Sequence, residues 1–469
     1  EKKAWNEGWV SVKGILRYDG KSMQQDILLR LKQIEKLLRP KDLVEQARTF
    51  ALSARGLNFD LEDDYDEDDT PSTQRTRVHR ITQEIGSKVA QDDAVFQELL
   101  PELVSVASDS YRLGIFGEGL ADGCKDRQRI WRMLYMQLEK TPPDRRQFAV
   151  LLGFLSSSAN HDPVFYNAVL DNLIEDELLG PWFPNFQTTS IVDARGIERL
   201  HQALDSGKSH INSFNSLAWS LREEIDDDNL APLLQKILTK EGGILVAIEI
   251  LNMRVHRSKN ELSTFSPSLV VAAREVMLKY PYDERQNQND RLDYELAQIA
   301  QICLIGANGT EHAKKICQIL TNGLHQYKIS TFDYPELFKC LAQIQPFIFL
   351  DIFVGSEETD FHRMEFDDVD RDYNPINQIL ENVLIDWCEQ DPKARYAQLV
   401  PSLLTYSRSQ ETDDLQWKPI VYSILKKSPD VQAILPGLER KIYPMSWSGS
   451  YADTLERRLI LFTSLYDHP

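Results

Sequence analysis

The chain has 469 residues, of which 42% are hydrophobic and 27% are charged, a balance that excludes a disordered polymer and is sufficient for a sizeable core. Its net charge of −19 repels phosphate backbones, so nucleic acid is a poor default partner. No apolar run is long enough to span a bilayer, and the five cysteines are widely spaced without a CxxC pair, which argues against a membrane partner and a structural zinc site.

Both the start of the chain and its cysteines predict a cytoplasmic location. The chain begins at Glu1 without a charged and then apolar leader, and the missing initiator methionine indicates a piece of a longer chain. An odd number of scattered cysteines is typical of reduced, buried thiols. We therefore expect a cytoplasmic protein that holds no metal, no nucleotide and no other cofactor.

The first segment, residues 1–59, is predicted to form one or more helical hairpins. Its apolar residues follow helical spacing from Ile27 to Leu38 and again from Leu43 to Leu52, with a break at Arg39-Pro40. An acidic block follows, because eight of the ten residues from Asp60 to Asp69 are carboxylates. We expect residues 60–76 to be a disordered loop, with a docking surface for a basic partner as the alternative.

Residues 77–469 are predicted to form an irregular α-solenoid of HEAT- or armadillo-like helical hairpins, which makes the whole chain all-α. Helical runs follow each other with short breaks, and alternating strand patterns are almost absent. One hairpin cannot bury its own apolar stripe, so neighbouring hairpins stack into a continuous core. A compact multi-helix bundle is the competing architecture.

Two hairpins are clearest in the sequence. Residues 230–251 contain two apolar stripes around Glu241-Gly242-Gly243, and residues 292–320 contain two more around Gly306 and Gly309. Further pairs are predicted at 129–157, 375–406 and 413–435.

Several glycine-rich stretches are similar to phosphate-binding loops but lack the spacing or the preceding strand that such loops require. In HQALDSGKS at 201–209 the first glycine of the GxxxxGK[ST] motif is replaced by Gln202, and in GILRYDGKS at 14–22 it lies one residue too far away. In GIFGEGLADG at 114–123 no strand precedes the glycines, so we expect a bend between helices. No nucleotide site is predicted.

Two aromatic segments are candidates for binding a protein. GPWFPNFQ at 180–187 contains Trp182, Phe183 and Phe186 between prolines that stop a helix, and YPMSWSGSY at 443–451 contains Trp447 and Tyr451. We expect the first to be a buried plug between hairpins, and the alternative is that these aromatic residues anchor a partner on an exposed face. Exposure is better supported for Trp447, which lies among small residues.

Two further patterns suggest chemistry. Asp370, Asp372, Asn374 and Glu381 have the spacing of a calcium loop, but Pro375 occupies the position that requires glycine. We instead expect Asn374 to cap a helix that begins at the proline, as Asp162, Ser266, Asp391 and Ser428 do before their own prolines.

Arg195 and His201 in ARGIERLH have a spacing used by helical ribonucleases, and their ordinary reading is a surface arginine and an unremarkable histidine. Because the sequence contains neither an HExxH nor a GxSxG motif, we expect no catalytic residue and no enzyme.

Several stretches together resemble the C-terminal helical-repeat region of large bacterial STAND NTPases, including antiphage defence proteins of the AVAST kind. They are LKQIEKLLRPKDLVEQARTFAL at 31–52, FQELLPELVS at 96–105, DELLGPWFPNFQ at 176–187 and GILVAIEILNMRV at 243–255. The resemblance implies a sensor of a foreign protein that works with upstream NTPase and effector domains. It carries over no site residues, because recognition in that family is spread over a surface.

The predicted function is therefore a non-enzymatic recognition module that binds a folded protein, such as a phage protein, in bacterial antiviral defence. A scaffold or regulatory subunit of a cytosolic complex is the first alternative. A helical ribonuclease that uses Arg195 and His201 is the second.

Overall fold

The computed structural model describes residues 2–52, 71–105, 110–219, 225–257, 265–283, 290–355, 374–408, 415–440 and 451–465. Within these residues the fold is all-α except for one two-stranded hairpin, as the sequence predicts. None of the described helices combines the length and the apolar content that crossing a membrane requires.

The chain forms two compact units, Glu1–Ile225 and Asp226–Pro469. The division falls inside the segment 77–469 that the sequence suggests is continuous. The acidic block at 60–69 lies outside the described residues. Helix α4 begins at Pro71, so residues 71–76, which we expected in the acidic loop, are the first residues of a helix.

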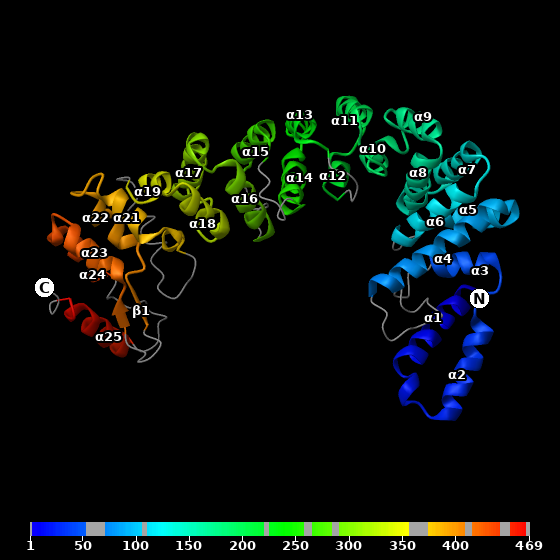
Figure 1. Cartoon of the computed structure of the whole chain (residues 1–469), viewed down its shortest axis with the longest axis horizontal. Helices are drawn as coiled ribbons and strands as arrows, with labels where there is room; N and C mark the ends of the chain where they lie inside the picture. The colour runs from blue at the N-terminus through cyan, green and yellow to red at the C-terminus, as the bar shows by residue number, and fades with distance from the viewer. Residues whose placement is uncertain are drawn as a thin grey trace. The chain divides into compact units, whose positions relative to one another are not determined.

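The first unit contains two rows of helices. Helices α4, α6 and α8 pack side by side, and the short helix α3 packs on α5, which packs on α7 (Figure 1). Hairpin α1–α2 precedes them, and α9 to α12 follow. The bounds are α1 Lys2–Tyr18, α2 Gln25–Leu38, α3 Leu43–Ala47, η2 Arg48–Leu52, α4 Pro71–Gln91, α5 Asp93–Leu103, α6 Ser110–Gly123, α7 Arg127–Lys140, α8 Ala149–His161, α9 Pro163–Leu173, η5 Gly180–Trp182, α10 Phe183–Gln187, α11 Ala194–Ser206, η6 Ile211–Asn215 and α12 Ser216–Trp219.

Glycines of α6 allow its backbone to contact both neighbouring helices. A Cβ atom at Gly119 would lie 2.0 Å from the carbonyl oxygen of Gln83 in α4, and one at Gly117 would lie 2.2 Å from that of Val150 in α8. The expected bend at 114–123 is therefore wrong, because this stretch is a continuous helix. Glycine is required in α6 because the neighbouring helices leave no room for a Cβ atom, and not because the chain turns there.

The second unit also has two rows of helices. Helices α13, α15, α17 and α19 pack in one order, and α14, α16, α18 and the turn η11 pack in another. The bounds are α13 Asp227–Ile237, α14 Gly243–Arg257, α15 Pro267–Lys279, α16 Asp290–Cys303, η9 Ala307–Gly309, α17 Thr310–His325, α18 Pro335–Ile344, α19 Pro346–Phe353, η11 Pro375–Gln378, α21 Glu381–Cys388, α22 Arg395–Leu399, η12 Val400–Ser402, β1 Tyr406–Arg408, β2 Leu415–Trp417, α23 Pro419–Lys427, α24 Val431–Arg440 and α25 Tyr451–Thr463.

The helices of the two clearest predicted hairpins are present as α13–α14 and α16–α17. α13 and α14 pack on each other, whereas α16 packs mainly on α18, α14 and α15 and α17 packs mainly on α19 and α15. The second one turns at Gly306, whose φ of 70° is in the left-handed region that favours glycine. The pair at 129–157 corresponds to α7 and α8. The pair at 413–435 is only partly helical, because β1 and β2 form an antiparallel ladder in which Tyr406 faces Trp417.

The predicted helix starts at prolines are confirmed in part. Asp162 and Ser266 accept hydrogen bonds from the backbone three residues later, as caps of α9 and α15. Asp391 opens a turn before α22, and Asp430, not Ser428, caps the helix that follows. The sequence identified each boundary but placed these two starts too early.

Asn374 caps a shorter element than we expected. Its Oδ1 accepts from the Ile376 N–H at 2.9 Å, and its Nδ2 donates to the Ser402 carbonyl oxygen at 2.8 Å. The turn ends at Gln378, and α21 begins at Glu381, so the predicted continuous helix is two elements. Asp370 and Asp372 lie outside the described residues.

Candidate functional site

The aromatic segment at 180–187 is mainly core. Phe183 and Phe186 are fully buried, whereas Trp182 is 38% exposed. The Trp182 ring is tilted against Phe148, with centroids 5.2 Å apart, and packs edge-on against His210, with centroids 5.3 Å apart. The buried plug that we expected is present, and of these three residues only Trp182 presents surface to a partner.

The prolines of this segment do not prevent helix formation. Pro181 and Pro184 lie in the first turns of η5 and α10, where the missing N–H removes no helical hydrogen bond. Of the second predicted aromatic segment, Trp447 lies outside the described residues. Tyr451 begins α25, and its side chain also lies outside the described part.

The Arg195 and His201 pair lies on α11 without converging. Six residues of a helix correspond to about 600° of rotation, which places the two side chains on different faces. Arg195 forms a 2.5 Å ion pair with Asp171 of α9, and its side chain is 54% exposed. Neighbouring Arg199 is buried, and it donates from Nε to Asp171 and from Nη2 to the Asn167 side chain, each at 2.8 Å. The arginines thus hold α9 against α11.

The two GKS triplets lie in turns. Gly207 ends α11 with a φ of 69°, the left-handed conformation common after helices. The Lys208 ammonium that follows donates to Glu177 at 2.7 Å and to the Glu175 carbonyl oxygen at 2.5 Å. The other triplet, Gly20–Ser22, is the turn between α1 and α2.

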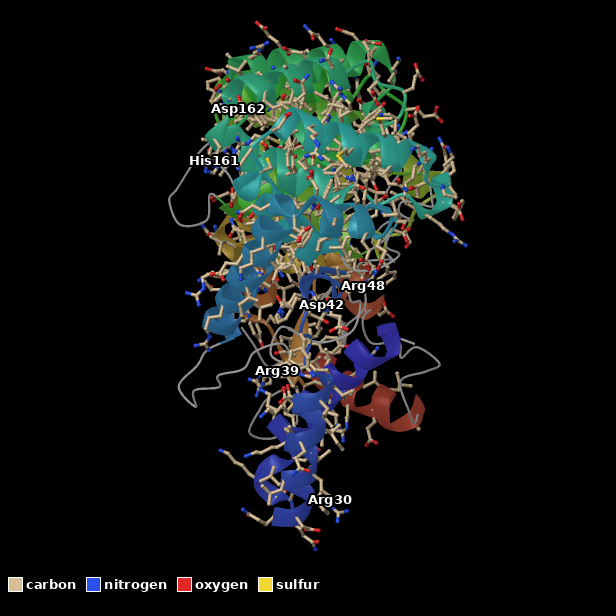
Figure 2. All side chains as sticks on the ribbon, turned by 90° about the vertical axis from the view of Figure 1, so that its right-hand side faces the viewer. Arg30, Arg39, Asp42, Arg48, His161 and Asp162 are labelled. Carbon is tan, nitrogen blue, oxygen red and sulfur yellow. The ribbon has the colours of Figure 1, made fainter. Side chains whose placement is uncertain are left out.

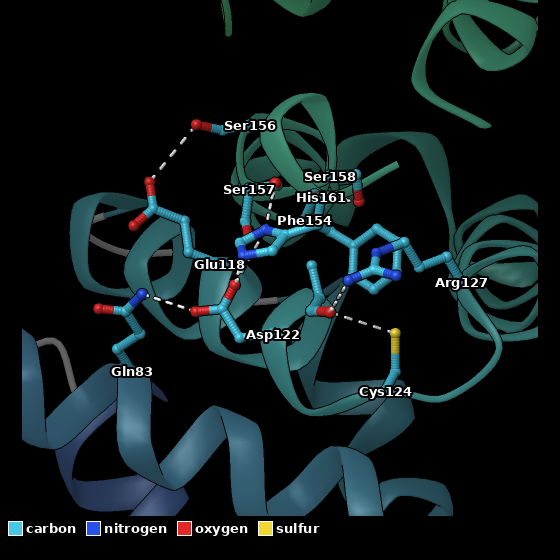
Figure 3. A network of polar contacts seen from close by, with 11 residues as sticks. Gln83, Glu118, Asp122, Cys124, Arg127, Phe154, Ser156, Ser157, Ser158 and His161 are labelled. Carbon is cyan, nitrogen blue, oxygen red and sulfur yellow. Dashed lines mark hydrogen bonds and ion pairs between the residues drawn. The ribbon is translucent and has the colours of Figure 1, made fainter. Parts of the chain in front are cut away.

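A polar network that the sequence did not reveal joins α4, α6 and α8 (Figure 3). At its centre, Asp122 of α6 accepts a 2.8 Å hydrogen bond from Gln83 Nε2 of α4. Its other carboxylate oxygen accepts a hydrogen bond from the Ser157 hydroxyl of α8. His161 Nδ1 lies 3.3 Å from Ser157 Oγ and 3.8 Å from Asp122. The network therefore links one helix row from α4 to α8.

The network contains a serine, a histidine and an aspartate, but they are not ordered as a catalytic relay. In such a relay the serine donates to the histidine, and the opposite ring nitrogen of the histidine donates to the carboxylate. Here Ser157 donates directly to Asp122. The Nδ1 atom of His161 also lies 3.0 Å from the Ser157 carbonyl oxygen, so one ring nitrogen faces all three groups. This arrangement connects helices and does not activate Ser157.

Next to this network, two side chains contact the same backbone carbonyl at the turn between α6 and α7. The Cys124 thiol lies 3.4 Å from the Ala121 carbonyl oxygen, to which Arg127 also donates at 3.1 Å. Burial raises the pKa of Cys124, so the thiol stays protonated and unreactive at neutral pH. All five cysteines are free thiols with buried side chains. Among the described residues, no group of three or more metal-ligating side chains could hold an ion.

The second unit contains an unusual helix cap. Asp293 of α16 is 2% exposed, and its two oxygens accept from the Glu336 and Leu337 N–H groups at 2.7 and 2.9 Å. These N–H groups belong to the first turn of α18, so a neighbouring helix supplies its cap. Burial raises the pKa of Asp293 to about 6, and the two N–H donors oppose that rise.

A second buried carboxylate connects α14 to α16. Glu295 accepts from Arg291 Nε at 2.7 Å and from Asn252 Nδ2 at 3.3 Å. Burial raises the pKa of Glu295, and the adjacent Arg291 guanidinium opposes the rise. Arg291 also pairs with Glu249 of α14. Like Asp122 in the first unit, this group links consecutive members of one helix row.

Comparison of the chain with family models, with curated proteins and with solved structures gives no match.

Proposed function

We propose that this chain is a non-enzymatic recognition module, an irregular α-solenoid of HEAT- or armadillo-like hairpins that binds a folded protein. The observation that supports it is a recurring sequence separation between helices of one row. Asp122 is 39 residues from Gln83 and 35 from Ser157. In the second unit Asn252 is 43 residues from Glu295.

A separation of this size equals one helical hairpin. Asp293 and Leu337 are 44 residues apart, and Asp228 and Ser268 are 40 apart. Helical-hairpin repeats of the HEAT and armadillo type are about 40–47 residues long. Three of the five separations lie in this range, and the two at Asp122, 39 and 35 residues, are slightly shorter. Each of these ties therefore joins a helix to the equivalent helix of the next hairpin, which is the relation that a stacked repeat produces.

The rows in each unit also run in one direction. In the first unit, Gly119 faces Gln83 and Gly123 faces Ser87, so residue numbers increase together along α4 and α6 and the helices are parallel. In a stack of helical hairpins every second helix has the same direction, so parallel helices within a row are expected. A row of parallel helices places side chains from several hairpins on one extended surface, which suits a large protein partner.

The polar network of the α4–α6–α8 row is our candidate recognition surface in the first unit. Its frame is stiff, because α6 contacts both neighbours through its backbone. Its polar groups are accessible, since the His161 side chain is 55% exposed and that of Asp122 is 29% exposed. A surface ordered before binding loses little conformational entropy when a partner docks. The fully buried Phe183 and Phe186 take no part in this surface.

The proposal extends to the role of the module in a larger protein. The stretches that resemble the helical-repeat region of STAND NTPases support a sensor of phage proteins in bacterial antiviral defence. The upstream NTPase and effector domains of the same longer chain would then be its partners.

Binding of the isolated chain to a panel of purified phage proteins tests the proposal. We expect a saturable complex with one of them, weakened at least tenfold by His161→Glu on the candidate surface. The matched control is Lys140→Glu at the exposed end of α7, which should bind normally. Failure to bind any folded protein, or equal loss in both variants, would contradict the proposed surface.

A further inference from the structure

Hairpin α1–α2 differs from the remaining hairpins of the first unit in having little of its surface buried. In Figure 1 it extends away from α4–α8. Trp9 anchors its base, because this residue is 2% exposed and its ring is tilted against that of Phe50 with centroids 6.3 Å apart. Its Nε1 also donates to Glu35 at 2.8 Å. None of the side chains of α2 is buried. The hairpin is therefore fixed at one end and exposed along most of its length.

The exposed surface of this hairpin is rich in large apolar side chains. Leu37 is 72% exposed, Tyr18 64% and Leu29 54%. Three further apolar residues are more than one third exposed, namely Ile15, Ile27 and Ile34. Water exposure of this much apolar surface in one element is unfavourable and is typical of an interaction site.

The same hairpin is basic although the chain is acidic. Residues 2–38, which span the hairpin, contain eight basic and four acidic residues, a net charge of +4, whereas the chain as a whole has −19. Arg30, Lys32 and Lys36 of α2 are all exposed. Figure 2 shows Arg30 near the far end of the hairpin and Arg39 nearer its base. Positive charge thus accompanies the apolar side chains.

The positions of the exposed apolar side chains around α2, together with the positive charge of the hairpin, indicate what kind of partner can cover them. On a helix, Ile27 and Ile34 share one face, while Leu29 lies about 140–160° away from them. A single flat protein surface cannot cover both faces of α2. A second copy of the hairpin is also unfavourable, because each copy carries a net charge of +4. A fluid anionic surface can surround a hairpin from several sides and attract its cations.

We propose that hairpin α1–α2 inserts into the surface of a membrane that contains anionic lipids. Its aliphatic side chains enter the boundary between head groups and acyl chains, and its lysines and arginines contact the lipid phosphates. Tyr18 near the turn is of the type that favours this boundary. From the sequence we argued against a membrane partner only because no apolar run is long enough to span a bilayer. A hairpin that lies in the membrane surface does not require a spanning helix.

The net negative charge of the remaining chain does not prevent this contact. Electrostatic repulsion in physiological salt is screened over about 8 Å, which is shorter than the hairpin: α2 has 14 residues and a length of about 21 Å. Charges more than a screening length from the lipid head groups therefore repel them little, and the basic side chains of the hairpin that touch the head groups determine the attraction.

Flotation of the whole chain with lipid vesicles tests the proposal. One set of vesicles contains only phosphatidylcholine, and the other contains equal parts of phosphatidylcholine and phosphatidylglycerol. We expect flotation with the anionic set and its loss in high salt, because the attraction depends on charge. Equal flotation with both sets, or flotation with neither, would overturn the proposal.

Paired variants separate the hairpin from the rest of the chain. Lys32→Glu with Lys36→Glu, and separately Ile34→Gln with Leu37→Gln, should each lower the partition coefficient about tenfold or more. The control is Val164→Gln on α9, where an 81% exposed apolar side chain lies outside the hairpin. It should float like the unmodified chain, and circular dichroism checks that each variant is folded. Unchanged flotation of both hairpin variants would overturn the proposal.

Discussion

At the scale of single residues, the glycines of α6 differ in whether the packing of neighbouring helices leaves room for a side chain. Gly119 and Gly114 lie on the same helix, but a Cβ atom at Gly119 would lie 2.0 Å from the Gln83 carbonyl oxygen, whereas at Gly114 the nearest atom is 3.7 Å away. We expect Gly119→Ala to lower the free energy of unfolding of the first unit by about 1–3 kcal/mol, because α4 and α6 must separate.

The matched substitution Gly114→Ala should be neutral or stabilising by up to about 1 kcal/mol, since alanine favours helix and meets no close atom. Urea unfolding followed by circular dichroism measures both. Similar destabilisation by the two alanines would show that backbone contact between α4 and α6 is not what the glycine at 119 provides.

Asp293 makes a residue-scale prediction about pH. Its pKa of about 6 in the folded chain is above the ordinary value of about 3.9. The folded state therefore holds the proton more tightly than the unfolded state. It follows that the contribution of Asp293 to stability is greatest below about pH 4 and declines as the pH rises through about 6.

Asp293→Asn removes this titration while keeping one acceptor for the first turn of α18. We expect the advantage of the unmodified chain over the variant to shrink between about pH 4 and about pH 7. Urea unfolding at several pH values measures the difference. Glu241→Gln, in the exposed turn between α13 and α14, is the control and should leave the profile unchanged. A constant difference between the chain and Asp293→Asn would contradict the assignment.

At the scale of elements, two arginines of α11 contact the same carboxylate of α9 from different environments. Arg199 and Arg195 both pair with Asp171, but their side chains are 3% and 54% exposed. Loss of the buried guanidinium leaves Asn167 without its donor and opens a cavity. Arg199→Ala should destabilise the first unit by about 2 kcal/mol.

The exposed pair is expected to contribute little. Arg195→Ala should cost less than about 1 kcal/mol, because water and salt screen an exposed ion pair. Thermal unfolding compares the two variants directly. An RNA cleavage assay on Arg195→Ala and on His201→Ala also tests the ribonuclease alternative, which requires activity in the unmodified chain that both substitutions remove.

The elements that sequence could predict are those whose signals are local. Apolar stripes and glycine breaks identified α13–α14 and α16–α17, and Asp162 was recognised as a cap because its partner is three residues away. The glycines of α6 were misread as a bend. Glycine is a poor helix former in isolation, so a glycine-rich stretch suggests a bend. Here glycine is needed because α4 and α8 pack closely on α6, and a local sequence pattern does not show which helices will be neighbours.

The candidate site was harder to predict, because its residues come from helices that are distant in the sequence. Asp122 binds Gln83 and Ser157, which come from helices one hairpin before and one hairpin after its own. No short motif connects such residues. The aromatic residues were conspicuous in the sequence, but composition alone could not distinguish Trp182 at the surface from Phe183 and Phe186 in the core.

At the scale of the whole molecule, the division into two compact units at Ile225 and Asp226 predicts how the chain unfolds. Each unit contains its own rows of helices and its own polar ties between them, such as the partly exposed Asp122 in the first and the buried Asp293 in the second. Independent cores lose their structure at different denaturant concentrations unless their stabilities are equal. We therefore expect two transitions in urea.

Substitutions already described assign each transition to a unit. Gly119→Ala should move only one of them, and Asp293→Asn only the other, because distant sites in separate cores act independently. Hydrogen exchange with mass spectrometry gives the same assignment by peptide, with faster exchange confined to the unit that carries the substitution. If either variant moves both transitions by the same amount, the units unfold cooperatively, and the chain must be treated as one folding unit.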